Sequence, residues 1–291
     1  MRAALAFIAF VASMSPVWAW GPEGHGLTAA IAEANLTPAA RGEVQRLLKL
    51  EDYRHLDEIS SWADAVRDAR PETAPWHYVD IPLKSKVYKQ SRDCHYDKDN
   101  NKVQELTCVV VILPKWVATL ADKTRPDPER LEALKWIVHF TGDVHQPLHT
   151  EDNKDRGGNE VHVMYFGEAK NLHSIWDGEV IEHNYGWKLG PNFSFDHDAI
   201  RKAAGAIDKK IVANSRKTWL SQGASAKLAA EVKEWANWSH SLAVPAYANL
   251  PARPRPPGWE KGYQAYAWPV VKVQLSAAGV RLAGILNEAL K

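Results

Sequence analysis

The sequence has no excess of charge of either sign. Its 36 lysine and arginine residues are matched by 35 aspartates and glutamates, giving a formal net charge of +1. A protein that holds nucleic acid by lysine and arginine alone should be strongly basic, so this composition excludes that class. Either bound cations supply any affinity for a polyanion, or the protein never meets one.

Cysteine is almost absent, and Cys94 and Cys108 are the only two. A disulfide between them would close a loop of about 15 residues, worth roughly 3 kcal/mol in the chain-entropy model. Two cysteines in an exported chain fit a disulfide better than a zinc site, and a disulfide requires an oxidising compartment.

Long apolar runs are also missing. After the N-terminus no segment offers the roughly 18 uninterrupted apolar residues that a membrane helix needs. The chain begins with a basic Arg2, a short apolar run over residues 3–12 and a small residue at Ala19, the pattern of a secretory signal peptide. We therefore predict a signal peptide at residues 1–19 and a soluble, secreted or periplasmic protein formed by residues 20–291. Cleavage after Ala19 would make Trp20 the N-terminus.

Helix signals dominate the exported chain. Thr37 as N-cap and Pro38 at the first helical position predict a helix through Leu50, and Pro128 opens a central helix in the same way. Further amphipathic helices are predicted over residues 196–220, 225–250 and 258–290.

Strand signals are few. The best candidate runs from Val161 to Phe166 and is closed by Gly167. The proline-rich segment 251–257 cannot be helical and must be an extended connection. The predicted class is mainly α: a single-domain, multi-helix fold with at most a small β-hairpin.

The most informative stretch is 137–159, which follows a helical pattern. His139 and Asp143 are four residues apart, so on a helix both side chains project from one face. Pro147 disfavours helical backbone at Gln146, so the helix should end there and His149 can turn back toward the pair. A single pair of this kind is weak support for a metal, because a surface ion pair or a buried structural histidine is commoner.

A second copy of the spacing changes this interpretation. His173 and Asp177 are again four residues apart. Two such pairs together with His149 predict a multinuclear site of imidazole and carboxylate ligands, which suits zinc. His145 lies about 240° round the helix from His139 and should face away from the site.

Other candidate ligands have structural alternatives. The α-amine of Trp20, freed by cleavage, could bind a metal together with the carbonyl of the same residue, with His25 close behind; otherwise Trp20 only packs. Asp64 and His77 could complete the ligands around His139, or be a surface carboxylate and a histidine in a tryptophan-rich core.

The motifs WGPEGH, SWADAVR, WHYVDIP, HFTGDVHQPLH, RGGN and NLHSIWD follow one another along the chain. In this order and spacing they resemble the S-one/P-one type of secreted, zinc-dependent, single-strand-specific nucleases of fungi, plants and bacteria. The resemblance covers essentially all of residues 20–291. It implies a nuclease-like and phospholipase C-like helical fold that holds three zinc ions in a cleft.

The resemblance also implies which residues bind these ions. The first ion would be held by Asp64, His77, His139 and Asp143. The second would be held by Trp20, through amine and carbonyl, with His25 and the bridging Asp143. The third, more distant ion would be held by His149, His173 and Asp177.

The implied activity is hydrolysis of single-stranded DNA and RNA to products with a 5′-phosphate, accompanied by 3′-nucleotidase activity. We expect a monomer. Arg67 would clamp a phosphate oxygen, and Asp80 would orient the nucleophile or the sugar. Tyr78, where the family often has phenylalanine, would stack on a base that Asn159 also holds.

Two other hypotheses for the function stay open. A zinc phospholipase C-like phosphodiesterase also uses an N-terminal tryptophan, but it has a longer gap to the first histidine and a glutamate where this chain has Asp177. A non-catalytic zinc-binding protein would have the ions without turnover. The remaining histidines match no ligand of the family and are expected to be structural or exposed: His55, His95, His162, His183, His197 and His240.

Overall fold

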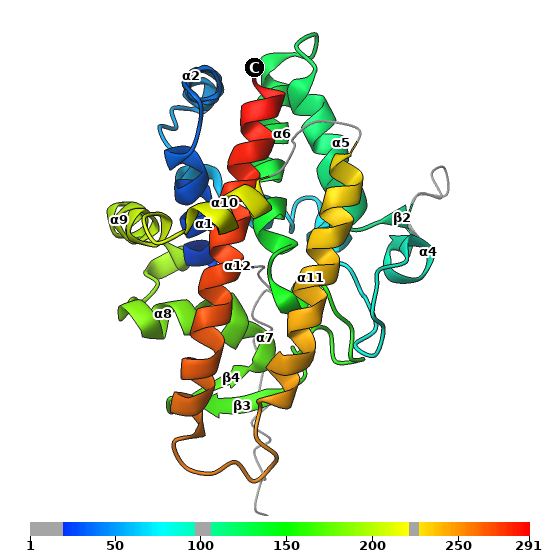
Figure 1. Cartoon of the computed structure of the whole chain (residues 1–291), viewed down its shortest axis with the longest axis vertical. Coiled ribbons are helices and arrows are strands. Elements are labelled where there is room, and N and C mark those ends of the chain that lie inside the picture. The colour runs from blue at the N-terminus through cyan, green and yellow to red at the C-terminus, as the bar shows by residue number, and fades with distance from the viewer. Residues whose placement is uncertain (1–19, 97–105, 221–226) are drawn as a thin grey trace, which may run out of the picture.

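The computed structural model describes residues 20–96, 106–220 and 227–291 (Figure 1). The predicted signal peptide, residues 1–19, lies outside this part of the chain, so its cleavage stays a prediction. Helices make up most of the described residues, and strands occur only in two small antiparallel ladders. The mainly α fold predicted from the sequence is confirmed.

The N-terminal half is built from short helical turns and four longer helices. In chain order its elements are α1 (Pro22–Ala34), α2 (Pro38–Leu48), η1 (Lys49–Glu51), η2 (Leu56–Ile59), α3 (Trp62–Ala65), η3 (Pro71–His77), α4 (Gln90–Asp93), β1 (His95–Tyr96), β2 (Leu106–Thr107), α5 (Val109–Ala121) and α6 (Asp127–Asp143).

The C-terminal half carries the second ladder and ends in the two longest helices. Its elements are η4 (Pro147–His149), β3 (His162–Tyr165), β4 (Glu168–Asn171), α7 (Leu172–Ser174), η5 (Ile175–Glu179), α8 (Val180–Tyr185), η6 (Pro191–Phe193), α9 (His197–Asp208), α10 (Ala213–Trp219), α11 (Leu228–Ala248) and α12 (Trp259–Ala289).

Several helix boundaries follow from the sequence signals. Thr37 caps α2 by accepting a hydrogen bond from the backbone N–H of Ala40, and Pro128 lies in the first turn of α6. The predicted helix over residues 196–220 is wrong as one piece: it starts as α9, capped by Asp196, and breaks before α10. The chain turns at Lys209 to Ile211, so the amphipathic pattern continues across a bend that it does not reveal.

The predicted strand is present as β3, one residue shorter at each end than expected. It pairs with β4 in an antiparallel hairpin, in which His162 lies opposite Asn171 and Tyr165 opposite Glu168. The β1–β2 ladder, of two residues a strand, was not predicted. It follows Cys94 and precedes Cys108, and these two cysteines form the predicted disulfide.

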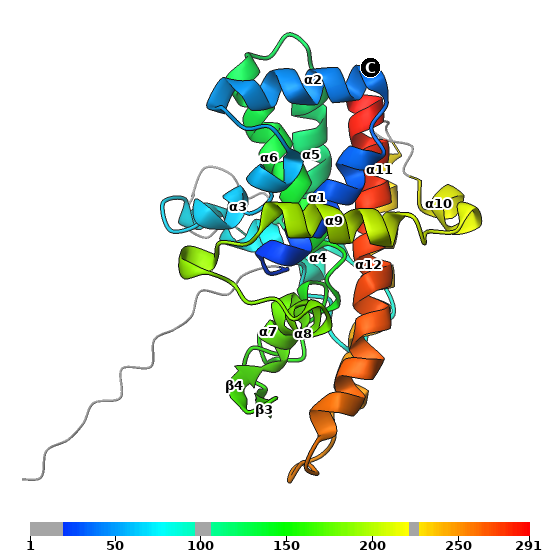
Figure 2. The ribbon, with the colours of Figure 1, turned by 90° about the vertical axis from the view of Figure 1, so that its left-hand side faces the viewer.

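Helix α12 runs along most of the length of the molecule, and several other helices pack against it (Figure 1). It packs against α1, α6, α5 and α2, while α1 also packs on α9 (Figure 2). At the crossing of α1 and α12 a Cβ at Gly279 would lie 2.4 Å from Ile31 Cγ2, so only glycine allows this approach.

Helix α12 is also long and apolar enough to cross a membrane by length and composition. However, 72% of its most apolar window is buried inside the structure, as in the core helix of a soluble protein. Its apolar side chains belong to two buried cores. One gathers around α5 and α6, and the other gathers around Trp20, the β3–β4 hairpin and the first half of α12.

Candidate metal centre

Helix α6 ends at the site and delivers its first two side chains. His139 Nε2 and Asp143 Oδ2 lie 3.3 Å apart, and both side chains are fully buried. Gln146 adopts extended backbone before Pro147, as the sequence predicted, and the short η4 turn then brings His149 back. His149 Nδ1 lies 3.7 Å from Asp143 Oδ1, so the turn returns to the same carboxylate.

Two elements from earlier in the chain meet this end of α6. His77, at the end of η3, places Nδ1 3.1 Å from Asp143 Oδ2 and 3.1 Å from His139 Nε2. Asp64, in the single turn of α3, places Oδ2 3.6 Å from His139 Nε2. Of the four residues that the resemblance assigns to one ion, His77, His139 and Asp143 bring one ligand atom each within 4.8 Å of one another, and Asp64 does so with His139 and His25.

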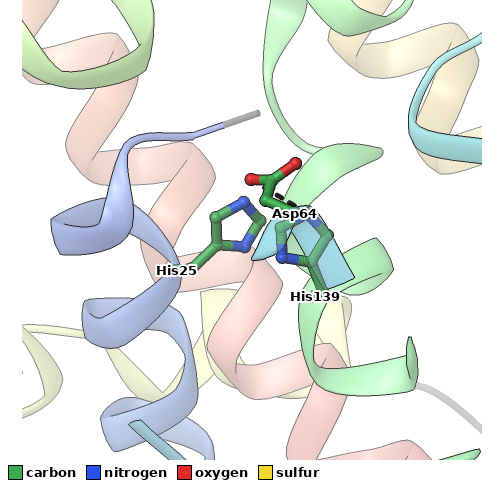
Figure 3. Close-up of side chains that lie close together, drawn as sticks. All are labelled: His25, Asp64 and His139. Carbon is green, nitrogen blue, oxygen red and sulfur yellow. Dashed lines mark ion pairs between the residues drawn. The ribbon is translucent and has the colours of Figure 1, made fainter. Parts of the chain in front are cut away.

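Helix α1 supplies His25 from the opposite side (Figure 3). Its ring stacks on that of His139, with centroids 3.8 Å apart. Its Nε2 lies 3.4 Å from Asp143 Oδ1. Gly142 makes this approach possible, because a Cβ there would lie 2.6 Å from His25 Nδ1. The two oxygens of Asp143 thus face different groups of ligands.

Trp20 is the first described residue and is completely buried. Its indole N–H donates to the carbonyl of Gly142 at 2.9 Å, and the backbone N–H of Gly21 donates to the carbonyl of Asp177 at 2.7 Å. These two bonds hold the backbone of Trp20 between α6 and the η5 segment, beside Asp143 and Asp177.

The last three predicted ligands form an adjoining group. His149 Nε2 lies 3.2 Å from His173 Nε2, and His173 Nε2 lies 3.3 Å from Asp177 Oδ2. His173 and Asp177 stand at the predicted four-residue spacing, but they span the junction of α7 with a π-helical turn, η5. Such turns are rare and often occur at functional sites.

Comparisons with known proteins identify the family of this chain. Residues 20–291 match the family model described as S1/P1 Nuclease. The chain belongs to the S1/P1 nuclease family. The predicted family, the enzyme class and the mainly α fold are thus confirmed, and this S1/P1 nuclease is a phosphodiester hydrolase.

Named relatives come from plants and fungi. Endonuclease 2 of Arabidopsis thaliana is 28% identical over 285 residues, covering 92% of this chain and 90% of its own length. Nuclease S1 of Aspergillus oryzae is 33% identical over 171 residues, 58% of this chain and 57% of its own. Nuclease P1 of Penicillium citrinum is 31% identical over 163 residues, covering 54% of this chain and 57% of its own length.

Carbonyl groups orient three of the histidines of this S1/P1 nuclease. His139 Nδ1 lies 2.8 Å from the carbonyl of Ser60, His149 Nδ1 3.1 Å from that of His77, and His173 Nδ1 2.6 Å from that of Gly157. A proton on each Nδ1 leaves the lone pair of Nε2 facing the other ligands, the arrangement that metal-binding histidines use.

Burial makes the imidazoles neutral. It lowers the pKa of His25, His77, His139 and His149, and neighbouring histidines lower it further for all of these but His139. Burial also raises the pKa of Asp143 and Asp177 well above the ordinary value, and the charge of Asp64 adds to the effect. A cation among these groups would reverse the cost of ionising both aspartates.

Several buried atoms have no hydrogen-bond partner in the described part of the chain. Those that face the ligand groups are Nε2 of His25 and Oδ1 of Asp143. Buried polar atoms are seldom left so, and paired Nε2 lone pairs 3.2 Å apart repel unless something positive lies between them. The residues present therefore fit metal ions, and nitrogen with carboxylate oxygen suits zinc.

The predicted substrate residues surround these ligands. Arg67 Nη1 lies 3.4 Å from Asp64 Oδ1, and its side chain is 23% exposed. Tyr78, directly after His77, and Asp80 are half-buried. Burial raises the pKa of the Tyr78 hydroxyl, which therefore stays protonated at neutral pH. Asn159 lines a cavity that His173 and Asp177 also line.

The structure adds residues that the sequence did not single out. Gln146 Nε2 donates to Asp177 Oδ1 at 2.6 Å, and its Oε1 accepts from the N–H of Leu148 at 2.6 Å, so this buried amide fixes a predicted ligand. Gly142 was the second omission. A glycine inside a helical pattern was its only signal, because such a residue usually has a packing or functional reason.

His145 lies outside the ligand groups, as predicted. Its Nδ1 donates to the carbonyl of Thr141 at 2.7 Å, and its Nε2 accepts from Arg281 at 2.6 Å. Burial, together with the charge of Arg281, lowers the pKa of His145, so its ring is neutral and serves packing.

Proposed function

We propose that residues 20–291 hold three zinc ions and hydrolyse phosphodiester bonds of single-stranded DNA and RNA. The products carry a 5′-phosphate, and 3′-nucleotides are a second class of substrate. The observation that carries the proposal is the convergence of buried histidines and aspartates whose metal-facing nitrogens lie against one another without a proton donor between them.

The proposed ligand sets are those that the family resemblance implies. Asp64, His77, His139 and Asp143 hold the first ion, Trp20, His25 and Asp143 the second, and His149, His173 and Asp177 the third. The two oxygens of Asp143 support its bridging role, because Oδ2 faces His77 while Oδ1 faces His25. The indole of Trp20, bonded to Gly142, and the N–H of Gly21, bonded to Asp177, anchor this segment and support binding through the amine and carbonyl of Trp20.

Zinc ions held there supply positive charge for the phosphate and an activated water. The chain's own residues supply orientation. Arg67, beside Asp64, donates to a non-bridging phosphate oxygen, and its bonds strengthen as negative charge grows on that oxygen. Asp80 accepts a hydrogen bond from the sugar or the attacking water, and Gln146 holds the carboxylate of Asp177 in place.

Burial explains the proposed preference for single strands. The ligands of all three ions are buried, so a phosphate reaches them only if its nucleotide leaves the stack. Tyr78 offers a ring for the released base, and Asn159 offers an amide to its edge. In a duplex this movement would also break a base pair.

Export follows from the role proposed for Trp20. Its amine binds a metal only after cleavage behind Ala19 has removed the signal peptide, residues 1–19. We propose a secreted or periplasmic, monomeric enzyme. The Cys94–Cys108 disulfide agrees with an oxidising compartment.

The decisive experiment uses the exported, processed chain. Its N-terminus and metal content are measured by mass spectrometry. Cleavage of single-stranded and double-stranded DNA, and of phosphatidylcholine, is then followed with chelator and after zinc is restored. We expect Trp20 at the N-terminus, three zinc ions and zinc-dependent cleavage of the single strand. Turnover of the lipid alone, or full zinc occupancy without cleavage, contradicts the proposal.

A further inference from the structure

The cavity that begins at His173 and Asp177 extends well beyond them. Its volume is about 820 Å³, within the range of pockets that hold drug-sized ligands, so it has room for more than one base. Its other walls are the β3–β4 hairpin, the η6 turn and the 251–257 segment that joins α11 to α12. The hairpin and this segment lie at the same end of the molecule (Figures 1 and 2).

Two arginines of the 251–257 segment line this cavity. Arg253 Nη2 donates to the carbonyl of His162 in β3 at 2.6 Å, and the guanidinium of Arg255 lies 5.4 Å from the centre of the Trp259 ring. Neither arginine forms an ion pair with any residue that the structure describes, so both charges remain available. Partial burial and the charge of Arg253 lower the pKa of Arg255, and a bound anion would relieve that repulsion.

An aromatic ring lines the same cavity. Phe193, at the end of η6, is 42% exposed, and its φ of 58° lies in the left-handed region that bulky residues rarely adopt. Non-glycine residues held in such backbone tend to cluster at functional sites. A ring presented in this way can stack on any base, because every base has a π face.

Carboxylates limit where a phosphate can bind. Glu23, Glu179 and Glu182 also line the cavity, and each would repel it on that side when ionised. Lys170 pairs with Glu179 and so adds little free positive charge. Within the described walls, the arginines of the 251–257 segment are the favourable place for an anion.

We propose that Phe193, Arg253 and Arg255 form a subsite for the nucleotide adjacent to the one held at Asn159. The base stacks on Phe193, and its phosphate binds the two guanidinium groups. This inference rests on the proposed function, because it extends the path of the same single strand. It makes the enzyme favour chains over isolated nucleotides through contacts that do not depend on sequence.

The test compares KM across oligothymidylates, from a dinucleotide to an octanucleotide, for the zinc-loaded enzyme and the Arg253→Ala/Arg255→Ala variant. In the wild type, KM should fall as the chain lengthens, and the variant should lose most of this fall. For the octanucleotide, the slope of log KM against log salt should decrease by about 0.7 in the variant, since each phosphate neutralised on a single strand contributes roughly 0.7 and the two guanidinium groups bind one phosphate.

Matched variants separate this site from general charge effects. Arg253→Lys/Arg255→Lys should retain the salt slope. Arg125→Ala removes an exposed arginine from the α5–α6 connection, at the opposite end of the molecule, and should retain both readouts (Figure 1). Phe193→Ala should raise KM for the octanucleotide at least about fivefold, the effect of one lost base stack.

The possible failures are distinguishable. If the wild type cleaves the single strand but the double variant keeps the length dependence and the salt slope, the subsite does not exist. If the wild type cleaves no single strand at full zinc occupancy, the proposed function itself is wrong.

Discussion

Two clusters of histidines and acidic residues in this molecule contain the same residue types. They differ in whether their carboxylate oxygens have hydrogen-bond donors. The metal centre buries its histidines completely, and Oδ1 of Asp143 has no hydrogen-bond partner among the described residues. A second cluster, which we name the Asp57 cluster, contains Glu33, His55, Asp57 and His197. Its two histidines are each 40% exposed.

Every carboxylate oxygen of the Asp57 cluster has a donor. Glu33 accepts from His55 Nδ1 at 2.9 Å and from the N–H of Leu56 at 2.8 Å. Asp57, itself buried, accepts from His197 Nδ1 at 2.7 Å and from Arg201 at 2.9 Å. A metal ion there would have to displace these donors and tolerate the guanidinium beside it, so we assign the cluster to structure.

The comparison shows what distinguishes a metal centre from a network of ion pairs. Residue types and distances are alike, and both clusters bring three ligand atoms within one metal's reach. The difference is how much negative charge of the carboxylates the chain's own donors leave unneutralised. The chain neutralises the acids of the Asp57 cluster with its own donors, whereas it leaves those of the metal centre for a cation.

The largest expected effect comes from Asp143→Asn. Asp143 belongs to two of the proposed ligand sets, so its loss should weaken the binding of two ions and reduce kcat/KM on single-stranded DNA at least on the order of 10³-fold. Zinc content and cleavage are measured together. A variant that keeps three ions and wild-type turnover would remove Asp143 from the site. Chelation of the wild type should cause a similar loss that zinc reverses.

Gln146→Met tests the support of a predicted ligand. The side chain keeps its size but loses the amide that donates to Asp177 Oδ1. We expect affinity for one zinc ion, and activity at limiting zinc, to fall about 10–100-fold, as for other residues that orient a ligand. Excess zinc should restore part of the activity. A lowered melting temperature with unchanged zinc affinity would assign Gln146 to packing alone.

Asp57→Asn makes in the Asp57 cluster the change that Asp143→Asn makes in the metal centre, replacing a carboxylate by an amide. It weakens the buried bonds to His197 and Arg201 and should lower the free energy of unfolding by about 1–3 kcal/mol. Urea unfolding measures this loss, while zinc content and kcat/KM of the folded variant should match the wild type. Loss of a zinc ion would mean that the Asp57 cluster also binds metal.

Glu182 illustrates a third way to neutralise an acid, which is to keep the proton. Burial and the charge of Glu179 raise the pKa of Glu182 to about 7, and burial with Glu182 raises that of Glu23 to about 8. Because the folded-state pKa is raised, the contribution of Glu182 to stability is present at low pH and is lost as pH rises through about 7.

Glu182→Gln should therefore stabilise the protein more at pH 8 than at pH 5. Glu182 is partly exposed and solvent screens its charge, so we expect a difference of only about 1 kcal/mol. Urea unfolding of both proteins at both pH values isolates this effect, because the other titrating groups are common to them. An equal effect of the substitution at the two pH values would contradict the raised pKa.

Local signals made much of this protein predictable. Thr37 and Pro128 marked helix starts, because capping and proline geometry act within a few residues. The two four-residue spacings placed His139 with Asp143 and His173 with Asp177 for the same reason. Pro147 predicted the extended backbone of Gln146, although α6 already ends at Asp143, three residues before the predicted end. The break between α9 and α10 was missed because an amphipathic period does not record a change of direction.

The sequence by itself determined the helical class, the family and the pairs of ligands that stand one turn apart. The tertiary structure decided which pairs meet. In the structure Gly142 leaves room for the ring of His25, and Gln146 donates a hydrogen bond to Asp177. Arg201 pairs with Asp57 and neutralises its charge. The physical reason is that the hydrogen-bond donors of a buried acid can come from residues far away in the sequence. Only the tertiary fold decides whether such donors lie next to the acid.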